Sequence, residues 1–230
     1  MKFSCYLFDL DNSLLYIPKP WEYFDNILIE TIQQYTEDRV PEKNERNSFW
    51  GAGNQYMDLL QKWGVQLDNY NDFWETFDSV DFKNRKILMK KEKIDLFPDV
   101  YSTLKELKSA KKKMGLVSNT AKDIVDHVIK QFNLNTYIQE IFALGEGKEQ
   151  EVAKPSPAGI QLVLKNLGIN LNNPNALMVG DSAVDIAAAK HANIQSCLVK
   201  RKENRHSYNY KSWDFQPDYV IDSLNEITDL

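Results

Sequence analysis

The chain has 230 residues, 27% of them charged, and a formal net charge of −5 at pH 7. This length accommodates one compact domain, or a core domain with a modest insertion, and it permits a sizeable buried core. The acidic balance and the interspersed Lys, Glu and Asp exclude a general surface for nucleic acid or anionic lipid, so any anionic substrate needs a local site.

Neither the cysteines nor the hydropathy pattern indicates secretion or a membrane. Cys5 and Cys197 lie in the apolar runs Phe3–Phe8 and Cys197–Val199, which favours buried free thiols and a reducing compartment over a disulfide framework. The first apolar run ends at Asp9, and no later run approaches the length of a membrane span. We expect a cytoplasmic protein with no nucleic-acid or membrane partner, and the sequence leaves monomer and homodimer open.

Short apolar runs that end in polar turns and precede helical patterns recur along the chain. The predicted strands are Phe3–Phe8, Met114–Ser118, Ile141–Leu144, Ala176–Gly180, Ser196–Val199 and Tyr219–Ile221. The predicted helices are Pro98–Ala110, Ala121–Phe132, Pro157–Leu167, Ser182–Lys190 and Leu224–Leu230. Pro157 suits a first helical turn, and Gly168 suits the residue just past a helix end. This alternation predicts an α/β fold with a parallel sheet.

The segment from Tyr16 to Glu92 interrupts the alternation, because it has no convincing strand and carries three long helix-like stretches. We interpret it as an inserted helical subdomain. Its aromatic residues are interpreted as core packing rather than a ligand cage; they include Trp21, Phe24, Trp63, Phe73, Trp74 and Phe77. The run Phe49–Gln55, with two glycines, is a candidate for substrate contact or simply a flexible turn between helices.

The longest polar, helix-poor stretch is Lys200–Gln216. Its basic residues are Lys200, Arg201, Lys202, Arg205 and His206. We interpret it as a solvated surface loop, with phosphate binding as the alternative.

The strongest local pattern is an apolar strand that ends in the run Asp9–Ser13, with a second carboxylate at Asp11. Carboxylates two residues apart at a strand end can point into one crevice, because alternate strand side chains share a face. A plain acidic turn is the alternative. A calcium-binding helix-loop-helix is excluded, because Leu14 stands where that loop needs glycine and no ligating Glu follows at its last position.

A second acidic run, Asp181–Asp185, follows the predicted strand Ala176–Gly180. Asp185 taken alone also fits a first-turn acid that favours the helix dipole. If the two acidic strands are neighbours, four carboxylates converge, and their mutual repulsion demands a cation. Ligands that are all oxygens favour Mg²⁺ over zinc.

Two further positions suit a phosphate site. Ser118 ends a predicted strand just before a helix, where its hydroxyl and nearby amides, with Asn119 beside it, could bind phosphate oxygens. The alternative for Ser118 is a plain helix cap. Lys154 precedes Pro155, which biases the lysine backbone towards an extended conformation. Taken alone, Lys154 is also compatible with an ordinary exposed lysine.

The series Asp-x-Asp, Ser, Lys-Pro and Gly-Asp-x-x-x-Asp, each beside a predicted strand, resembles the haloacid dehalogenase superfamily, in particular its phosphoglycolate phosphatase-like phosphohydrolases. The resemblance covers residues 1–15 and about 93–230, including the closing run Pro217–Asp222. It implies a doubly wound, Rossmann-like parallel-sheet core in those residues. It also implies an all-helical cap of the C1 type at residues 16–92.

Carried over position by position, the resemblance implies that Asp9 is the nucleophile that takes the phosphoryl group. Asp11 would protonate the leaving oxygen and later activate water. A magnesium ion would be held by Asp9, the backbone carbonyl of Asp11 and Asp181, with Asp185 as a further ligand or outer support. The aspartate at position 11 separates the chain from the dehalogenases of the superfamily and disfavours its ion-pumping branch.

The same resemblance assigns Ser118 and Asn119 to phosphate binding and gives Lys154 the task of neutralising charge on the phosphate. Asn12 and Ser13 stand where the family commonly has Gly-Thr. Asn tolerates left-handed backbone geometry and Ser keeps the hydroxyl, so the departure is tolerable.

The expected activity is magnesium-dependent hydrolysis of a small phosphorylated metabolite, such as phosphoglycolate, a triose phosphate or a sugar phosphate. A cap that closes over the crevice disfavours macromolecular substrates. A β-phosphoglucomutase-like phosphomutase that shuttles phosphate through Asp9 remains an alternative, because the core motifs are shared. A catalytically inactive binding protein is a third alternative, and it is disfavoured because every expected position holds a competent residue.

Overall fold

The computed structural model describes residues 1–37, 40–145, 151–172, 174–202 and 205–230. Its centre is a six-stranded sheet in the order β5-β4-β1-β6-β7-β8, with every neighbouring pair parallel. The strands are β1 (Cys5–Phe8), β4 (Lys113–Ala121), β5 (Glu140–Leu144), β6 (Ala176–Gly180), β7 (Gln195–Val199) and β8 (Tyr219–Ile221). The predicted α/β fold with a parallel sheet is confirmed.

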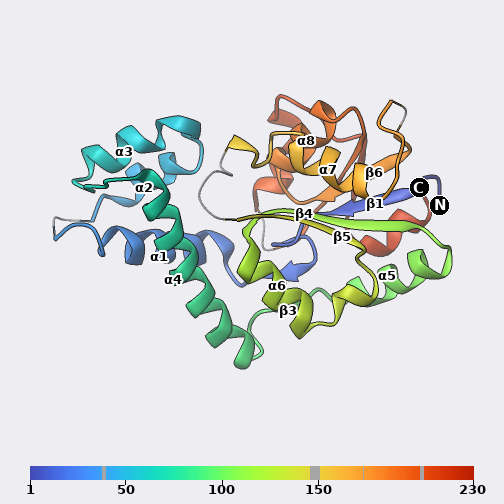
Figure 1. The fold of residues 1–230 in the computed structure, drawn as a ribbon, viewed down its shortest axis with the longest axis horizontal. Helices are drawn as coiled ribbons and strands as arrows, with labels where there is room; N and C mark the ends of the chain where they lie inside the picture. Colours follow the sequence, from blue (N-terminus) through green and yellow to red (C-terminus); the bar gives the residue numbers. More distant parts are fainter. Residues whose placement is uncertain (38–39, 146–150, 173, 203–204) are drawn as a thin grey trace.

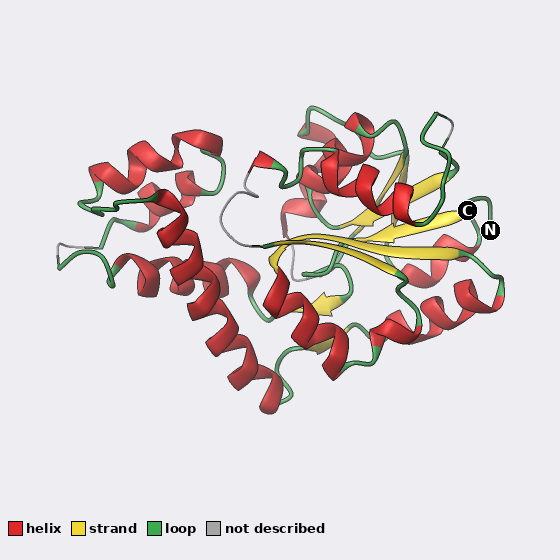
Figure 2. Ribbon diagram, viewed as in Figure 1, coloured by secondary structure: helices red, strands yellow, loops and turns green. Residues whose placement is uncertain are grey.

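Helices cover both faces of this sheet, with α7 and α8 on one face and α5 and α6 on the other (Figures 1 and 2). Their bounds are α5 (Val100–Ser109), α6 (Lys122–Gln131), α7 (Ala158–Asn166) and α8 (Ala183–His191), and a 3-10 turn, η2 (Leu134–Thr136), follows α6. Side chains of β1 alternate between the faces: Leu7 packs in the cluster of α7 and α8, and Phe8 in the cluster of α5 and α6. The core is therefore doubly wound, as predicted.

The predicted helix at Leu224–Leu230 is present, but it is a 3-10 helix and ends at Thr228. The segment Leu224–Thr228 (η5) forms a 3-10 helix, and Ser223 accepts a hydrogen bond from the Asn225 amide at its start. Leu224 and Ile227 are its buried residues. This spacing of three matches the three residues per turn of a 3-10 helix.

The interpretation of Lys200–Gln216 as a solvated loop is wrong for Arg201. That side chain is buried, lies 3.8 Å from the centre of the Phe97 ring, and donates to both carboxylate oxygens of Asp99 at 2.8 and 3.0 Å. It also donates to the Ser13 carbonyl at 2.8 Å. Arg201 thus fixes the chain after β7 against the loop that follows β1. A 3-10 segment, η4 (Arg205–Ser212), follows further along.

The segment between β1 and α5 forms a helical lobe beside the sheet (Figure 1). It contains α1 (Pro20–Ile32), α2 (Lys43–Phe49), η1 (Gly53–Gln55), α3 (Tyr56–Lys62) and α4 (Tyr70–Lys90). The helical character is as expected, but the described residues form two long and two short α-helices rather than three long ones. Gly64, with a φ of 79°, follows the end of α3, and Gly53, with a φ of 51°, lies between α2 and α3.

A small antiparallel pair joins the two parts of the molecule. The strands β2 (Leu15–Tyr16) and β3 (Asp95–Leu96) lie where the chain leaves the sheet and where it returns, and they pair Leu15 with Leu96. Both cysteines are buried and free, as predicted, and burial raises the pKa of the Cys5 thiol to about 12. No helix within the described part of the chain has both the length and the apolar composition that a bilayer crossing requires.

Candidate active site

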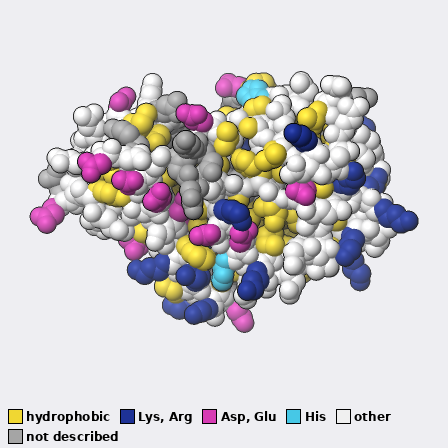
Figure 3. Space-filling view, viewed as in Figure 1, with side chains coloured by type: hydrophobic (Ala, Val, Ile, Leu, Met, Phe, Trp, Pro, Cys, Tyr) yellow, Lys and Arg dark blue, Asp and Glu magenta, His cyan; other side chains and the backbone are white. Residues whose placement is uncertain are grey.

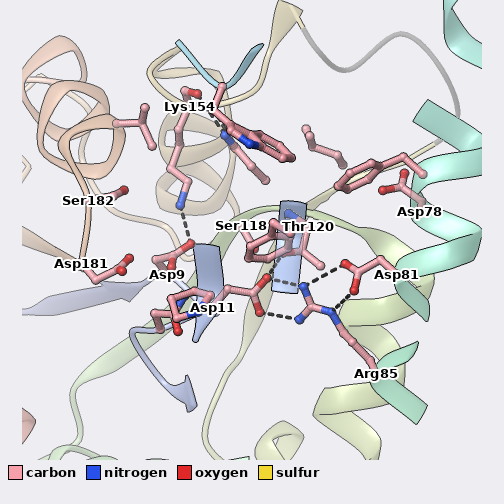
Figure 4. Close-up of a pocket in the computed structure, with 18 of the residues that line it drawn as sticks. Asp9, Asp11, Asp78, Asp81, Arg85, Ser118, Thr120, Lys154, Asp181 and Ser182 are labelled. Atoms are coloured by element: carbon pink, nitrogen blue, oxygen red, sulfur yellow. Dashed lines mark hydrogen bonds and ion pairs between the residues drawn. The ribbon is translucent and has the colours of Figure 1, made fainter. Parts of the chain in front are cut away.

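The three central strands bring the predicted site residues to one edge of the sheet. Asp9 follows β1, Asp181 follows β6, and Ser118 lies in the last part of β4. Because β1 pairs with both β4 and β6 in parallel register, their carboxyl ends meet at the same edge. Figure 4 shows these side chains converging on one pocket.

Lys154 lies at the centre of this cluster. Its buried Nζ donates to Asp9 Oδ1 at 2.6 Å, to Asp185 Oδ1 at 2.6 Å and to the Val117 carbonyl at 2.9 Å. Burial alone would lower the pKa of Lys154, but Asp185 and Asp9 raise it above its usual range. The lysine is therefore a fixed ammonium group beside Asp9, not an exposed side chain.

Three buried carboxylates gather at this site, and two of them bind the Lys154 ammonium group. Asp9, Asp181 and Asp185 each offer an oxygen within 4.8 Å of the others. Burial raises the pKa of Asp9 to about 7, Lys154 opposes this, and Asp185 adds to it. Further positive charge would offset the remaining repulsion, and the donor set consists of oxygens only. The residues present therefore fit Mg²⁺.

Asp185 has two partners besides any cation. Its Oδ1 accepts from Lys154, and its Oδ2 accepts from the Ser182 amide at 3.1 Å within the capping box that begins α8. A methyl group added at Gly180 would lie 2.3 Å from the Asp185 carboxyl carbon, so the absence of a side chain there makes room for it. Asp185 is thus both a helix cap and a member of the carboxylate cluster.

Ser118 and Asn119 have distinct contacts. Ser118 Oγ accepts from the Thr120 amide at 3.1 Å, while α6 begins only at Lys122 and has Ala121 at its cap, so the helix-cap alternative is wrong. The Asn119 side chain receives a bond from the Lys154 amide at 2.8 Å and donates to the Lys154 carbonyl at 3.0 Å. Asn119 therefore holds the Lys154 backbone in place.

Asp11 is bound from the helical lobe. Arg85, on α4, donates to Asp11 Oδ1 and Oδ2, each at 2.6 Å, and also pairs with Asp81 at 2.8 and 2.9 Å. Thr120 Oγ1 donates to Asp11 Oδ2 at 2.8 Å, and Tyr23 donates to Asp81 Oδ1 at 2.5 Å. The Asp11 carboxylate is thus held by one residue of the sheet and one of the lobe (Figure 4).

The sequence profile of the haloacid dehalogenase-like hydrolases matches residues 6–199. The chain belongs to this family. The predicted family and the predicted enzyme class, a phosphatase of this type, are thereby confirmed.

Relatives of this hydrolase are named as phosphatases of different substrates. Pyrophosphatase PpaX of Oceanobacillus iheyensis is 28% identical over 163 residues, which is 66% of this chain and 72% of that protein. Phosphoglycolate phosphatase of Nitrosococcus oceani is 33% identical over 135 residues, 59% of this chain and 56% of its own. The crystal structure of CbbY from Rhodobacter sphaeroides in complex with phosphate has a TM-score of 0.72 at 20% identity, covering 98% of this chain and 96% of that one.

The hydrolase has functional candidates that the sequence analysis missed. Trp74, Phe77, Asp78, Asp81 and Arg85 line the pocket. Their spacing of three, one, three and four places them on one face of α4. A stripe of aromatic and charged residues on one helix face is therefore the sequence signal that marks these positions.

The interpretation of the aromatic residues as core packing is only half right. Trp63, Phe73 and Phe77 are buried. Trp21, Phe24, Trp74 and Phe77 line the pocket, and so does Trp50 from the run Phe49–Gln55. The cavity measures about 470 Å³, within the usual range of small-ligand sites. In that run, the candidate for substrate contact is therefore Trp50.

Asp78 of the hydrolase is half-buried and faces several charges. Burial raises its pKa from 3.8 to about 7, Asp81 and Glu75 add to this, and Arg85 opposes it. Asp78 also lines a second pocket, together with Lys122 and Asp123 of α6. Between about pH 4 and pH 7, Asp78 is protonated in the folded protein and ionised in the unfolded chain. The free energy of unfolding of the wild type therefore falls as the pH rises through this range.

We therefore expect Asp78→Asn to stabilise the protein relative to wild type at alkaline pH. The difference in unfolding free energy, variant minus wild type, should rise by about 1–2 kcal/mol between about pH 4 and pH 8, less than the full shift because solvent screens a half-buried group. Urea unfolding at both pH values measures this difference. A constant difference would show that Asp78 titrates normally.

Proposed function

We propose that the chain is a magnesium-dependent phosphatase that hydrolyses a small phosphorylated metabolite through an aspartyl-phosphate on Asp9. We base this on the position of Asp9, which lies at the sheet edge against Lys154 and among three buried carboxylates. The family membership, the phosphatase names of the relatives and the pocket beside Asp9 support the proposal.

In the first step, an oxygen of Asp9 forms a bond to phosphorus while the bond from phosphorus to the ester oxygen breaks. Asp11, which Arg85 holds as a carboxylate in this structure, first takes up a proton from solvent and then gives it to the leaving oxygen. In the second step, water gives a proton to Asp11 and attacks phosphorus, which releases phosphate and restores the Asp9 carboxylate. Thr120 and Arg85 orient the Asp11 carboxylate for both transfers.

Lys154 and Ser118 would stabilise charge on the transferring group. Asn119 supports this by fixing the backbone of Lys154. Asp9, Asp181 and the carbonyl of Asp11 would hold Mg²⁺, with Asp185 supporting them, and the ion would supply positive charge to the phosphate oxygens.

We propose residues 16–92 as a cap domain over a core of residues 1–15 and 93–230. The pocket is lined by both parts, with Asp9 and Ser118 from the core and Trp50 and Phe77 from the lobe. A substrate must therefore fit between them, which favours a small molecule over a macromolecule.

The test is release of inorganic phosphate from a panel of small phosphate esters, with magnesium and after chelation. We expect release that falls at least about a hundredfold on chelation and recovers when magnesium is returned. Calcium serves as a matched control, because its larger, looser coordination should not restore the rate. Equal rates with and without magnesium would contradict the metal assignment, and isomerised sugar phosphate without free phosphate would indicate the mutase.

A further inference from the structure

One part of the pocket lining is aromatic. Phe24 and Trp50 have ring centres 6.2 Å apart, Trp50 and Phe77 are 5.8 Å apart, and Phe77 and Trp74 are 5.6 Å apart. All four residues line the cavity that also contains Asp9. We call this set of four the aromatic wall. Its rings pack edge to face, Phe77 is buried, and the Arg85 guanidinium already lies over the Phe24 ring at 5.8 Å, so the indole rings of Trp50 and Trp74 are the members left to contact a bound ligand.

The cations of the pocket are already neutralised. Among the described residues that line it, Arg85 and Lys154 are the basic ones. Arg85 binds the carboxylates of Asp11 and Asp81, and Lys154 binds two others. An anionic group on the leaving side of the substrate would therefore find no uncompensated positive charge in the described part of the site.

Asp78 adds a carboxyl group next to the aromatic wall, and a cation bound beside it would favour its charged form. Asp78 follows Phe77 directly, lines the same cavity, and lies on the pocket side of α4 (Figure 4). Within the described residues it accepts no hydrogen bond and forms no ion pair, and its surroundings act on it only by burial and by neighbouring charges. A half-buried carboxylate without a partner lowers stability, so a ligand that pairs with it explains its presence.

The helical lobe beside the pocket carries a net negative charge. Residues 16–92 carry 14 acidic and 10 basic side chains, so most of the net charge of −5 lies in the lobe. On the face drawn in Figure 3, acidic side chains are spread over this lobe. Such a field attracts cations and opposes a second anionic group on an approaching substrate.

We propose that the substrate is a phosphate monoester whose alcohol part carries an ammonium group, seated on the aromatic wall beside Asp78. A cation against aromatic faces is stabilised by the negative π surface, and the adjacent carboxylate completes the charge pairing. This inference rests on the proposed phosphatase function. It separates the chain from relatives named for pyrophosphate and phosphoglycolate, because both of those substrates carry negative charge beyond the reacting phosphate.

Three esters test the charge preference. Phosphocholine and its uncharged carbon analogue 3,3-dimethylbutyl phosphate match in size, phosphoglycolate is a smaller ester with a negative alcohol part, and p-nitrophenyl phosphate serves as a general phosphatase substrate. We expect kcat/KM for phosphocholine to exceed that for the uncharged analogue by about tenfold, and phosphoglycolate to be the poorest of the three. Equal or greater kcat/KM for either of the other two would overturn the proposal.

The variant Asp78→Asn tests whether Asp78 causes the preference for a positively charged ester. The ratio of kcat/KM for phosphocholine to that for the uncharged analogue should fall about tenfold in this variant. Glu75→Gln is the matched control, because it removes one charge from the same helix at an exposed position outside the cavity, and it should leave the ratio within about twofold of wild type. An unchanged ratio in Asp78→Asn would remove Asp78 from the site.

Choline binding separates failure of this inference from failure of the proposed function. Tryptophan fluorescence should report choline binding that weakens in Asp78→Asn, whether or not any ester is hydrolysed. Hydrolysis of p-nitrophenyl phosphate without choline binding would sink the ammonium site and leave the phosphatase intact. Choline binding without hydrolysis of any ester would support the ammonium site and contradict the phosphatase function.

Discussion

Asp9→Asn will reduce phosphate release at least about a thousandfold. An amide lacks the charged oxygen that forms the bond to phosphorus. The substitution keeps the size of the side chain and an oxygen that can still accept the bond from Lys154 Nζ. The loss should therefore appear in kcat with every ester, since the missing group is the nucleophile and not a determinant of binding.

Two measurements make this result specific. Asp214→Asn, an exposed aspartate far along the chain, makes the same chemical change and should retain full activity. Acid-quenched wild type should carry one additional phosphoryl group by intact-protein mass, and Asp9→Asn should carry none. Turnover that survives in Asp9→Asn would show that another group attacks phosphorus.

Arg85→Met will destabilise the protein by about 3–5 kcal/mol, because it leaves the carboxylates of Asp11 and Asp81 without their shared cation. For a chain of this size the expected fall in melting temperature is roughly 10 °C. Arg85→Lys keeps the charge but loses the bidentate geometry. Its melting temperature should therefore lie between those of Arg85→Met and the wild type. Thermal unfolding measures all three proteins.

Lys83→Met is the control for the Arg85 variant. It removes a cation from the same helix, but Lys83 is exposed and lies 3.7 Å from Glu30 in a surface pair, so it should cost less than about 1 kcal/mol. Arg85→Met should also lower kcat, since Asp11 loses its orientation, and Lys83→Met should not. Equal shifts in the two variants would mean that the buried network contributes no more than a surface pair.

The core of the fold and the predicted cluster were accessible from the sequence because strands and their terminal residues have strong local patterns. Asp9 and Asp181 each follow an apolar run, and parallel neighbours bring such ends together. Asn12 adopts a φ of 57°, the left-handed geometry expected where the family has glycine. These features depend on only a few residues of sequence context.

The contacts between the lobe and the core could not be predicted from local sequence patterns. Arg85 and Asp11 are 74 positions apart, and nothing in either local sequence indicates the other. Arg201 and Asp99 form a comparable pair over 102 positions. Such pairs follow from how the lobe and loops pack in three dimensions, so residue patterns predicted a polar loop where the structure has a buried ion pair.

The two-stranded pair of β2 and β3 affects how the substrate specificity of this chain could change in evolution. The chain enters and leaves the helical lobe through hydrogen-bonded neighbours, Leu15 and Leu96, while the sheet keeps its own register. Under the proposed function, mutations in the lobe can therefore change substrate choice without disturbing the carboxylates at the sheet edge. Arg85 limits this freedom, because without a cation there Asp11 would keep only the bond from Thr120. Selection on specificity is thus free along most of the lobe and constrained at one turn of α4.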